Sequence, residues 1–166
     1  MKALLIAAAL LTAAPLSARS PTPETIEVMN GVSDFFTALS SDDKSALAKQ
    51  MIPEGTIFIH NRMTPDAARV DVVPVAKHLE NWLKSPDDVA EVMHIETVEV
   101  DGDMAQVWGP YYFTVAGKLS HCGINSLSMV RRDGAWLVAN TSFTMEPPQQ
   151  CEALVAKINS HIEFEQ

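Results

Sequence analysis

The chain has 166 residues, of which 47% are hydrophobic and 20% charged, and its formal net charge at pH 7 is -9. This length suits one domain with a sizeable core and is too short for two typical domains. The negative charge argues against a surface that neutralises nucleic-acid phosphates, and the hydrophobic content excludes wholesale disorder. We therefore expect one globular domain that does not bind nucleic acid.

Residues 1–18 have the layout of a secretory signal peptide. Lys2 supplies a positive charge, residues 3–14 are an almost uninterrupted apolar run, and Pro15 ends that run. The run is too short to span a bilayer, although an uncleaved N-terminal anchor stays an alternative. We expect an exported protein, periplasmic or secreted, that leaves the membrane after cleavage, with residues 19–24 as a stiff linker.

The part of the chain that follows the linker begins with predicted helices. Residues 24–40 carry apolar side chains at spacings of three and four, which is typical of an amphipathic helix. Two shorter helices are predicted over residues 42–51 and 73–85, with a strand over residues 56–61 between them.

Beyond these helices the pattern changes to long strands. They are predicted over residues 89–100, 104–115, 118–131 and 135–146. The links between them are short and contain glycine, so consecutive strands must be antiparallel neighbours. A last helix is predicted over residues 151–162. The fold class is α+β, with helices packed on one face of a curved antiparallel sheet.

The chain contains two cysteines, Cys122 and Cys151. Cys122 lies in a predicted strand, and Cys151 follows a strand that is expected to pair with it. In an oxidising compartment we expect them to form a disulfide, with two free thiols as the alternative.

The turn residues predict the register of the first long hairpin. A two-residue loop would force Ala116 to a positive φ, which costs a non-glycine residue about 1 kcal/mol. A three-residue loop with Gly117 in the left-handed region is therefore expected. This register places Tyr111 opposite His121.

The second long hairpin is predicted in the same way. A three-residue loop pairs Arg131 with Ala135. It then places Asn125 opposite Thr141.

These registers separate an apolar face of the sheet from a face rich in hydroxyl groups. The apolar face collects Val107, Tyr111, Phe113, His121, Asn125, Leu127, Met129, Leu137, Ala139, Thr141, Phe143 and Met145. It must pack on the helices, because the other face is too polar to be buried. Tyr111, His121, Asn125 and Thr141 are the polar exceptions on it.

The four polar exceptions form the candidate ligand-binding site. Apolar walls with a few convergent polar groups are typical of a small-molecule cavity. His121 can exchange a proton near neutral pH, and Tyr111 can orient it or hold an oxyanion. A core histidine that is hydrogen-bonded to Tyr111 without any ligand stays an alternative. His60, on the first predicted strand, is a further candidate to point inward.

Other motifs are uninformative or absent from the sequence. No HxH, HExxH or CxxC spacing occurs, so we expect neither a metal site nor a cofactor. The Asp101-Gly102 turn permits two registers that send His94 to opposite faces, so the inward residues of strand 89–100 are not assigned.

Several short segments are similar to a known family. They are VDGDMA at 100–105, VWGPY at 107–111, GKLSHCG at 117–123 and DGAW at 133–136. With the order of elements, they resemble the nuclear transport factor 2-like, or SnoaL-like, superfamily, and within it a bacterial lumazine-binding branch. The resemblance covers residues 25–146 and implies a sheet wrapped over three helices around a conical pocket, commonly in a homodimer. The tail, residues 147–166, lies beyond it.

The sequence departs from the enzymes of this superfamily in one respect. Its isomerases and cyclases use an acidic base inside the cone. The inward positions assigned above contain no Asp or Glu, and Asn125 stands where related sequences often have Asp. This departure argues against carboxylate-based catalysis.

Three hypotheses of function follow from the sequence. In the first, which we favour, the protein holds an unidentified small molecule in the cone through Tyr111, His121, Asn125 and Thr141. In the second, it is a cofactor-independent isomerase, dehydratase or cyclase, with His121 as general acid or base and Tyr111 as hydrogen-bond donor. In the third, it is a dimeric scaffold whose cavity is filled by its own side chains.

Overall fold

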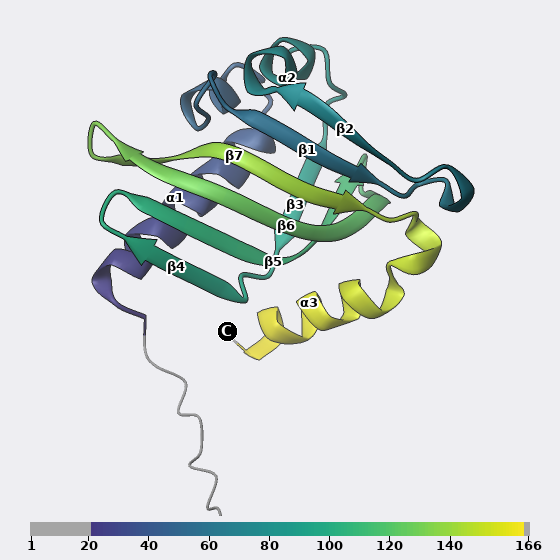
Figure 1. Ribbon diagram of the computed structural model, residues 1–166. Helices are drawn as coiled ribbons and strands as arrows, with labels where there is room; N and C mark the ends of the chain where they lie inside the picture. The colour runs from purple at the N-terminus through teal and green to yellow at the C-terminus, as the bar shows by residue number, and fades with distance from the viewer. Residues whose placement is uncertain (1–20, 165–166) are drawn as a thin grey trace, which may run out of the picture.

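The chain folds as one curved sheet with helices on both of its faces (Figure 1). A computed structural model describes residues 21–164, so the predicted signal peptide lies outside the described residues. The elements are α1 (Pro23–Leu39), η1 (Ala46–Lys49), β1 (Thr56–Asn61), η2 (Pro65–Ala67), β2 (Arg69–Pro74), α2 (Val75–Trp82), β3 (Val89–Met93), β4 (Thr97–Asp101), β5 (Met104–Val115), β6 (Lys118–Arg132), β7 (Ala135–Met145), η3 (Pro148–Gln150) and α3 (Glu152–Phe164), where η marks short 3-10 helices. The predicted α+β class is confirmed.

The strands form a single mixed sheet. Their order is β2-β1-β7-β6-β5-β3, and β4 also pairs with β5. The pairings are antiparallel except that of β1 with β7, which is parallel. The expectation of a wholly antiparallel sheet is therefore wrong at this one contact, where a long connection brings the first strand beside the last.

The helices lie on opposite faces of the sheet, so the expectation that they pack on one face is wrong for α3. In Figure 1, α1 passes behind the strands and α3 lies in front of them. Helix α1 begins at Pro23, where the backbone N–H of Thr25 donates to the Thr22 hydroxyl at 3.2 Å, a typical N-terminal cap. Its buried side chains, among them Val28, Val32 and Phe35, form the main core with the inner face of the sheet.

Two of the predicted helices differ in length from the expectation. Residues 42–51 form only η1, because the backbone near Gln50 and Ile52 bonds to Val138 of β7 instead of continuing a helix. The helix predicted over residues 73–85 is shortened to α2, because the residues before it pair with β1 as the edge strand β2.

The strand predicted over residues 89–100 is divided into β3 and β4, which both pair with β5. The division falls beside Gly109, where an added Cβ would lie 1.9 Å from the carbonyl oxygen of His94. Only glycine allows the two backbones to come this close, and the close approach accompanies the bend of the chain between β3 and β4.

The three-residue loop predicted for the β5–β6 hairpin is wrong. Val115 pairs with Lys118, so the loop has two residues, and Ala116 adopts a φ of 50°. A turn with positive φ at both central residues matches the twist of the strands, and this outweighs the local cost. A bulge at Ser120 follows, so that His121 lies opposite Phe113 instead of Tyr111.

The β6–β7 hairpin departs from the prediction in the same way. Its two-residue turn is followed by a bulge at Ala139, and Thr141 lies opposite Leu127 instead of Asn125. Leu137 and Ala139 were expected on the inner face, but Trp136 and Val138 are buried there instead. Beyond the bulge, Thr141, Phe143 and Met145 face inward, as predicted.

The predicted disulfide is confirmed, since Cys122 of β6 is bonded to Cys151, directly before α3. Both residues are fully buried. The bond anchors α3 on the face of the sheet that is opposite to α1, where Ile158 of the helix is also buried. Within residues 21–164 no helix is long and apolar enough to cross a membrane.

The strained turn at Ala116 gives a stability prediction. Ala116→Asn should raise the free energy of unfolding by about 1 kcal/mol, because Asn tolerates the left-handed region and Asn-Gly is the favoured pair in such turns. Gly117→Ala, which places a side chain at φ 67°, should lower it by a similar amount. Urea unfolding of both variants measures this, and an unchanged midpoint for both would contradict the geometry of the turn.

Candidate functional site

A cavity of about 200 Å³ lies between the inner face of the sheet and helices α1 and α2. It is lined by Phe35, Leu39, Met51, Ile57, His78, Trp82, Glu91, Tyr111, Phe113, His121, Asn125, Leu127, Thr141, Phe143 and Met145. Most of these side chains are apolar, and the polar ones come mainly from β3, β5 and β6. Tyr111, His121, Asn125 and Thr141, the four polar residues predicted from the sequence, lie together in this cavity.

A hydrogen bond between two strands forms the polar centre of the cavity. The Nδ2 atom of Asn125, on β6, donates to Oε1 of Glu91, on β3, over 2.6 Å. Glu91 lies opposite Phe113 in the ladder, and Phe113 lies opposite His121. Neighbours across a sheet point to the same face, so these three side chains stand in one row on the inner wall.

The carboxyl group of Glu91 titrates far from its ordinary range. Burial raises its pKa from 4.5 to about 7, against the opposing effect of the hydrogen bond from Asn125. The residue also lines an open groove between α1 and β3, so part of its surface is accessible although its carboxyl group is buried. At neutral pH this carboxyl therefore exchanges between its protonated and ionised forms.

His121 is neutral at physiological pH. Burial lowers its pKa from 6.5 to about 4. Its ring stacks on Phe113, with centroids 5.0 Å apart, and its Nδ1 lies 3.1 Å from the hydroxyl of Ser120. A neutral imidazole with such a low pKa is a weak base at pH 7, but it can still donate or accept a hydrogen bond.

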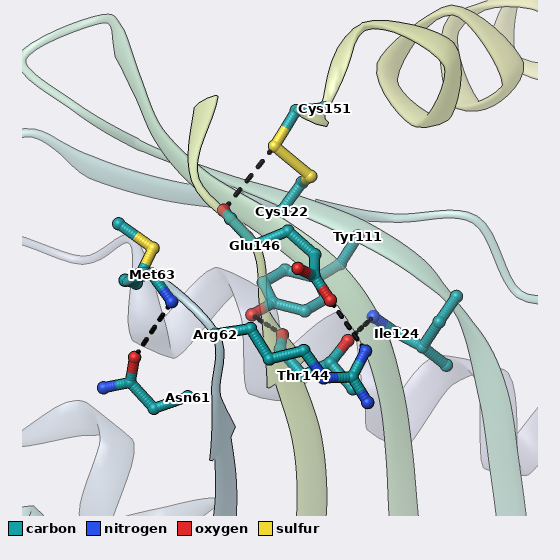
Figure 2. A network of polar contacts seen from close by, with 9 residues as sticks. All are labelled: Asn61, Arg62, Met63, Tyr111, Cys122, Ile124, Thr144, Glu146 and Cys151. Atoms are coloured by element: carbon teal, nitrogen blue, oxygen red, sulfur yellow. Dashed lines mark hydrogen bonds and ion pairs between the residues drawn. A yellow bond between two sulfur atoms is a disulfide. The ribbon is translucent and has the colours of Figure 1, made fainter. Parts of the chain in front are cut away.

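Tyr111 is held by the backbone of β7, as Figure 2 shows. Its hydroxyl donates to the carbonyl oxygen of Thr144 at 2.8 Å, while the Thr144 hydroxyl accepts from the backbone N–H of Ile124 at 2.9 Å. The ring meets His121 only edge to face, with centroids 5.8 Å apart. The expectation that the Tyr111 hydroxyl orients His121 is therefore wrong, and this hydroxyl is already used by the backbone.

Thr141 and His60 have different positions. Thr141 is buried and lines the cavity. His60 does not line it: its Nε2 lies 3.0 Å from the hydroxyl of Ser142, on the outer face of the sheet. Ile57, on the same strand, faces the cavity, so the alternation along β1 turns His60 outward, and the expectation that it points inward is wrong.

Sequence reasoning missed Glu91, the one carboxylate in the cavity lining. Its strand was left without a register, so it could not be assigned to a face. A signal was present, since Glu91 shares its parity with Met93, the largest apolar residue of β3. The inward positions that the sequence assigns contain no acid, but the cavity contains Glu91, so the argument against carboxylate-based catalysis does not hold.

The described residues offer no cluster of metal ligands. Among residues 21–164, no group of three or more His, Cys, Asp or Glu side chains is placed to hold a metal ion. Among the described residues, the polar groups of the cavity lining are thus a carboxyl, an amide, a hydroxyl, a phenol, two imidazoles and the indole N–H of Trp82.

The raised pKa of Glu91 predicts a pH dependence of stability. Between about pH 4.5 and 7 the folded state keeps a proton on Glu91 that the unfolded chain has lost, so the contribution of Glu91 to the free energy of unfolding falls as pH rises. The lowered pKa values of His121 and His78 act in the opposite direction below about pH 6.5, so the prediction concerns the difference between the wild type and a variant without this carboxyl. The loss should reach up to about 3 kcal/mol at pH 8, since one pKa unit corresponds to about 1.4 kcal/mol.

Glu91→Gln should remove this contribution, because the amide cannot ionise and still accepts from Asn125, so the stability of the variant relative to the wild type should increase as pH rises. Glu99→Gln, an exposed position on β4, is the matched control and should keep the wild-type dependence. Urea unfolding from about pH 5 to 8 measures all three proteins. Parallel curves for the wild type and Glu91→Gln would contradict the raised pKa.

The chain matches no protein-family model and no curated protein, but it is similar to many solved structures. A nuclear transport factor 2-like protein of unknown function from Silicibacter pomeroyi is 15% identical, with a TM-score of 0.55 over 74% of this chain and 95% of its own. Another, from Shewanella oneidensis, is 13% identical, with a TM-score of 0.57 over 73% of this chain and 98% of its own.

A ketosteroid isomerase-like protein from Erwinia carotovora is similar to the same extent. It is 16% identical, with a TM-score of 0.54 over 74% of this chain and 96% of its own. At such identities the likeness concerns the fold alone. The chain has the nuclear transport factor 2-like fold that the order of its elements predicted.

Proposed function

We propose that the protein binds a small organic molecule in the cavity between α1, α2 and the sheet. The observation that carries this proposal is the combination of an apolar wall with the Asn125–Glu91 pair. In a mostly apolar cavity, such a pair fixes the orientation of a ligand and provides specificity, while the apolar wall supplies affinity. A scaffold filled by its own side chains would have no such space, so we do not favour it.

The volume of the cavity limits the size of the ligand. A cavity of about 150 Å³ is large enough for benzene, so about 200 Å³ accommodates a molecule of about one substituted ring. A lumazine has two fused rings and would require the cavity to widen. The resemblance to the lumazine-binding branch therefore stays a prediction, and we favour a smaller ligand.

We further propose that the protein acts after export, in the periplasm or outside the cell. The signal-peptide pattern of residues 1–18 supports export. The Cys122–Cys151 disulfide is compatible with it, because disulfides persist in oxidising compartments. A homodimer, which the family resemblance implies, stays a prediction.

The binding proposal predicts a bound molecule in protein taken from its own compartment. Native mass spectrometry should show an adduct of the wild type that Leu127→Phe loses, because the larger side chain fills part of the cavity. Ser126→Phe, at the adjacent outward position, is the matched control and should keep the adduct. A wild type without any adduct, or an adduct that Leu127→Phe retains, would contradict binding at this site.

A second candidate function is a cofactor-independent isomerase, and the pKa of Glu91 is the observation that favours it. A general acid or base is most effective when its pKa lies near the working pH. Glu91, with a pKa of about 7, meets this condition, whereas His121, with a pKa of about 4, does not. We therefore assign the acid–base role in this candidate to Glu91, with His121 as a hydrogen-bond partner. The isomerase-like name of the Erwinia protein is compatible with this chemistry.

This candidate predicts proton transfer on a ligand that the cavity can hold. With cyclohex-3-en-1-one as substrate, the wild type should form the conjugated enone, with a rate that rises through about pH 7 as Glu91 ionises. Glu91→Gln should lower the rate by about 100-fold or more, and Glu99→Gln should not change it. Ultraviolet absorbance follows the product, and equal rates for both variants would eliminate Glu91 as the base.

A further inference from the structure

The walls of the cavity are rich in aromatic rings. Five of the lining residues are aromatic: Phe35, Trp82, Tyr111, Phe113 and Phe143. The rings of Tyr111 and Phe143 are inclined by 89°, with centroids 6.2 Å apart, so they do not form a parallel stack. Aromatic side chains that line a cavity can stabilise a cation that lies over a ring face, and this property favours a positively charged guest.

The charge that the cavity lining carries at neutral pH is negative. Glu91 exchanges between its neutral and ionised forms, while burial lowers the pKa values of His121 and His78 and so favours their neutral forms. Burial raises the pKa of Tyr111, so that its phenol is also neutral. No Lys or Arg from residues 21–164 lines the cavity.

One wall of the cavity already has a cation on an aromatic ring. The Nζ atom of Lys44 lies over the ring of Trp82, 5.9 Å from its centroid, and is buried without a hydrogen-bond partner. Lys44 itself is not a lining residue. Because its charge would repel a second cation at Trp82, we place the guest cation near Glu91, Tyr111 and Phe113 instead.

We propose that the ligand of this cavity is a small organic cation, a quaternary ammonium or a protonated amine, whose charge is paired with Glu91 and surrounded by aromatic rings. This inference rests on the proposed binding function and names its ligand class. It follows from the juxtaposition of one carboxylate with Tyr111, Phe113 and Phe143 in a cavity that lacks a lining Lys or Arg among the described residues.

The energetics of the carboxylate favour a cation over a neutral or anionic ligand. A buried carboxylate without a countercharge is unfavourable, and the amide of Asn125 supplies only a neutral hydrogen-bond donor. A quaternary ammonium would offset the charge without needing hydrogen-bond acceptors, and a protonated amine could donate to the carboxylate itself. An anion would meet a like charge, and a neutral ligand would leave the carboxylate unpaired.

Binding of a cation must also be coupled to the protonation of Glu91. The groups that face it are Tyr111 from β5, His121 from β6 and His78 from α2, while α1 contributes the apolar side chains of Phe35 and Leu39. All three of those titratable groups favour the neutral form at neutral pH. A permanent cation should therefore bind more tightly as pH rises through about 7, and its binding should release a proton from Glu91.

Three probes of nearly equal shape test the sign of the charge. They are choline, its neutral isostere 3,3-dimethylbutan-1-ol, and the anion 3,3-dimethylbutanoate, which isothermal titration calorimetry compares on the full folded chain. At about pH 8.5 choline should bind about tenfold more tightly than the alcohol, with the anion weakest. At about pH 5.5 the advantage of choline should shrink, because Glu91 is protonated and only the aromatic rings favour the charge. Titration of choline at pH 7 in two buffers of different ionisation enthalpy should show proton release.

A pair of variants assigns the effect to one carboxylate. Glu91→Gln should lower the affinity for choline about tenfold at pH 8.5 and leave that for the alcohol unchanged, whereas Glu99→Gln should behave as the wild type. Equal affinities of wild type for choline and the alcohol at pH 8.5, or unchanged choline binding by Glu91→Gln, would overturn the proposal.

The outcomes also separate this proposal from the binding function on which it rests. If native mass spectrometry shows the cavity adduct but none of the three probes binds, or the alcohol binds as well as choline, the ligand class is wrong and the binding function stands. If no adduct is found and no probe binds, both are wrong.

Discussion

The hydrogen bond between Asn125 and Glu91 is the contact on which the chemistry of the cavity depends. It joins β6 to β3 across the inner face of the sheet and holds the carboxyl group among aromatic side chains. A residue without a donor group at position 125 would leave the Glu91 carboxyl without this hydrogen bond. The amide thus allows an acid to occupy an apolar cavity and to stay ionisable at physiological pH.

Much of the fold could be predicted because it depends on patterns along the chain. The apolar stripe of α1, the alternation along β5 to β7 and the glycines in the links were sufficient for the α+β class and the order of the main elements. The partnership of Cys122 with Cys151 could be predicted because the chain has only two cysteines. The parallel contact of β1 with β7 could not, since nothing in either segment records which strand will lie beside it.

The site was predicted in part, and for a partly fortunate reason. The register of the first hairpin was displaced by two residues, and a displacement of two leaves every side chain on the same face. His121 and Asn125 were therefore placed on the correct face beside incorrect neighbours. Glu91 was missed because the Asp101-Gly102 turn permits two registers of its strand. His60 was misplaced because its register depends on a strand from the far end of the chain.

The two bulges have a consequence for how the length of this chain can vary. Each adds one residue to a strand between the hairpin tip and the cavity, at Ser120 and at Ala139. Deleting either residue would exchange the inward and outward side chains on one side of the deletion. The exchange would affect either the hairpin tip or the cavity wall. In relatives with the same cavity lining, insertions and deletions at these hairpin tips should therefore involve two residues. A single insertion or deletion should be balanced by another within the same hairpin.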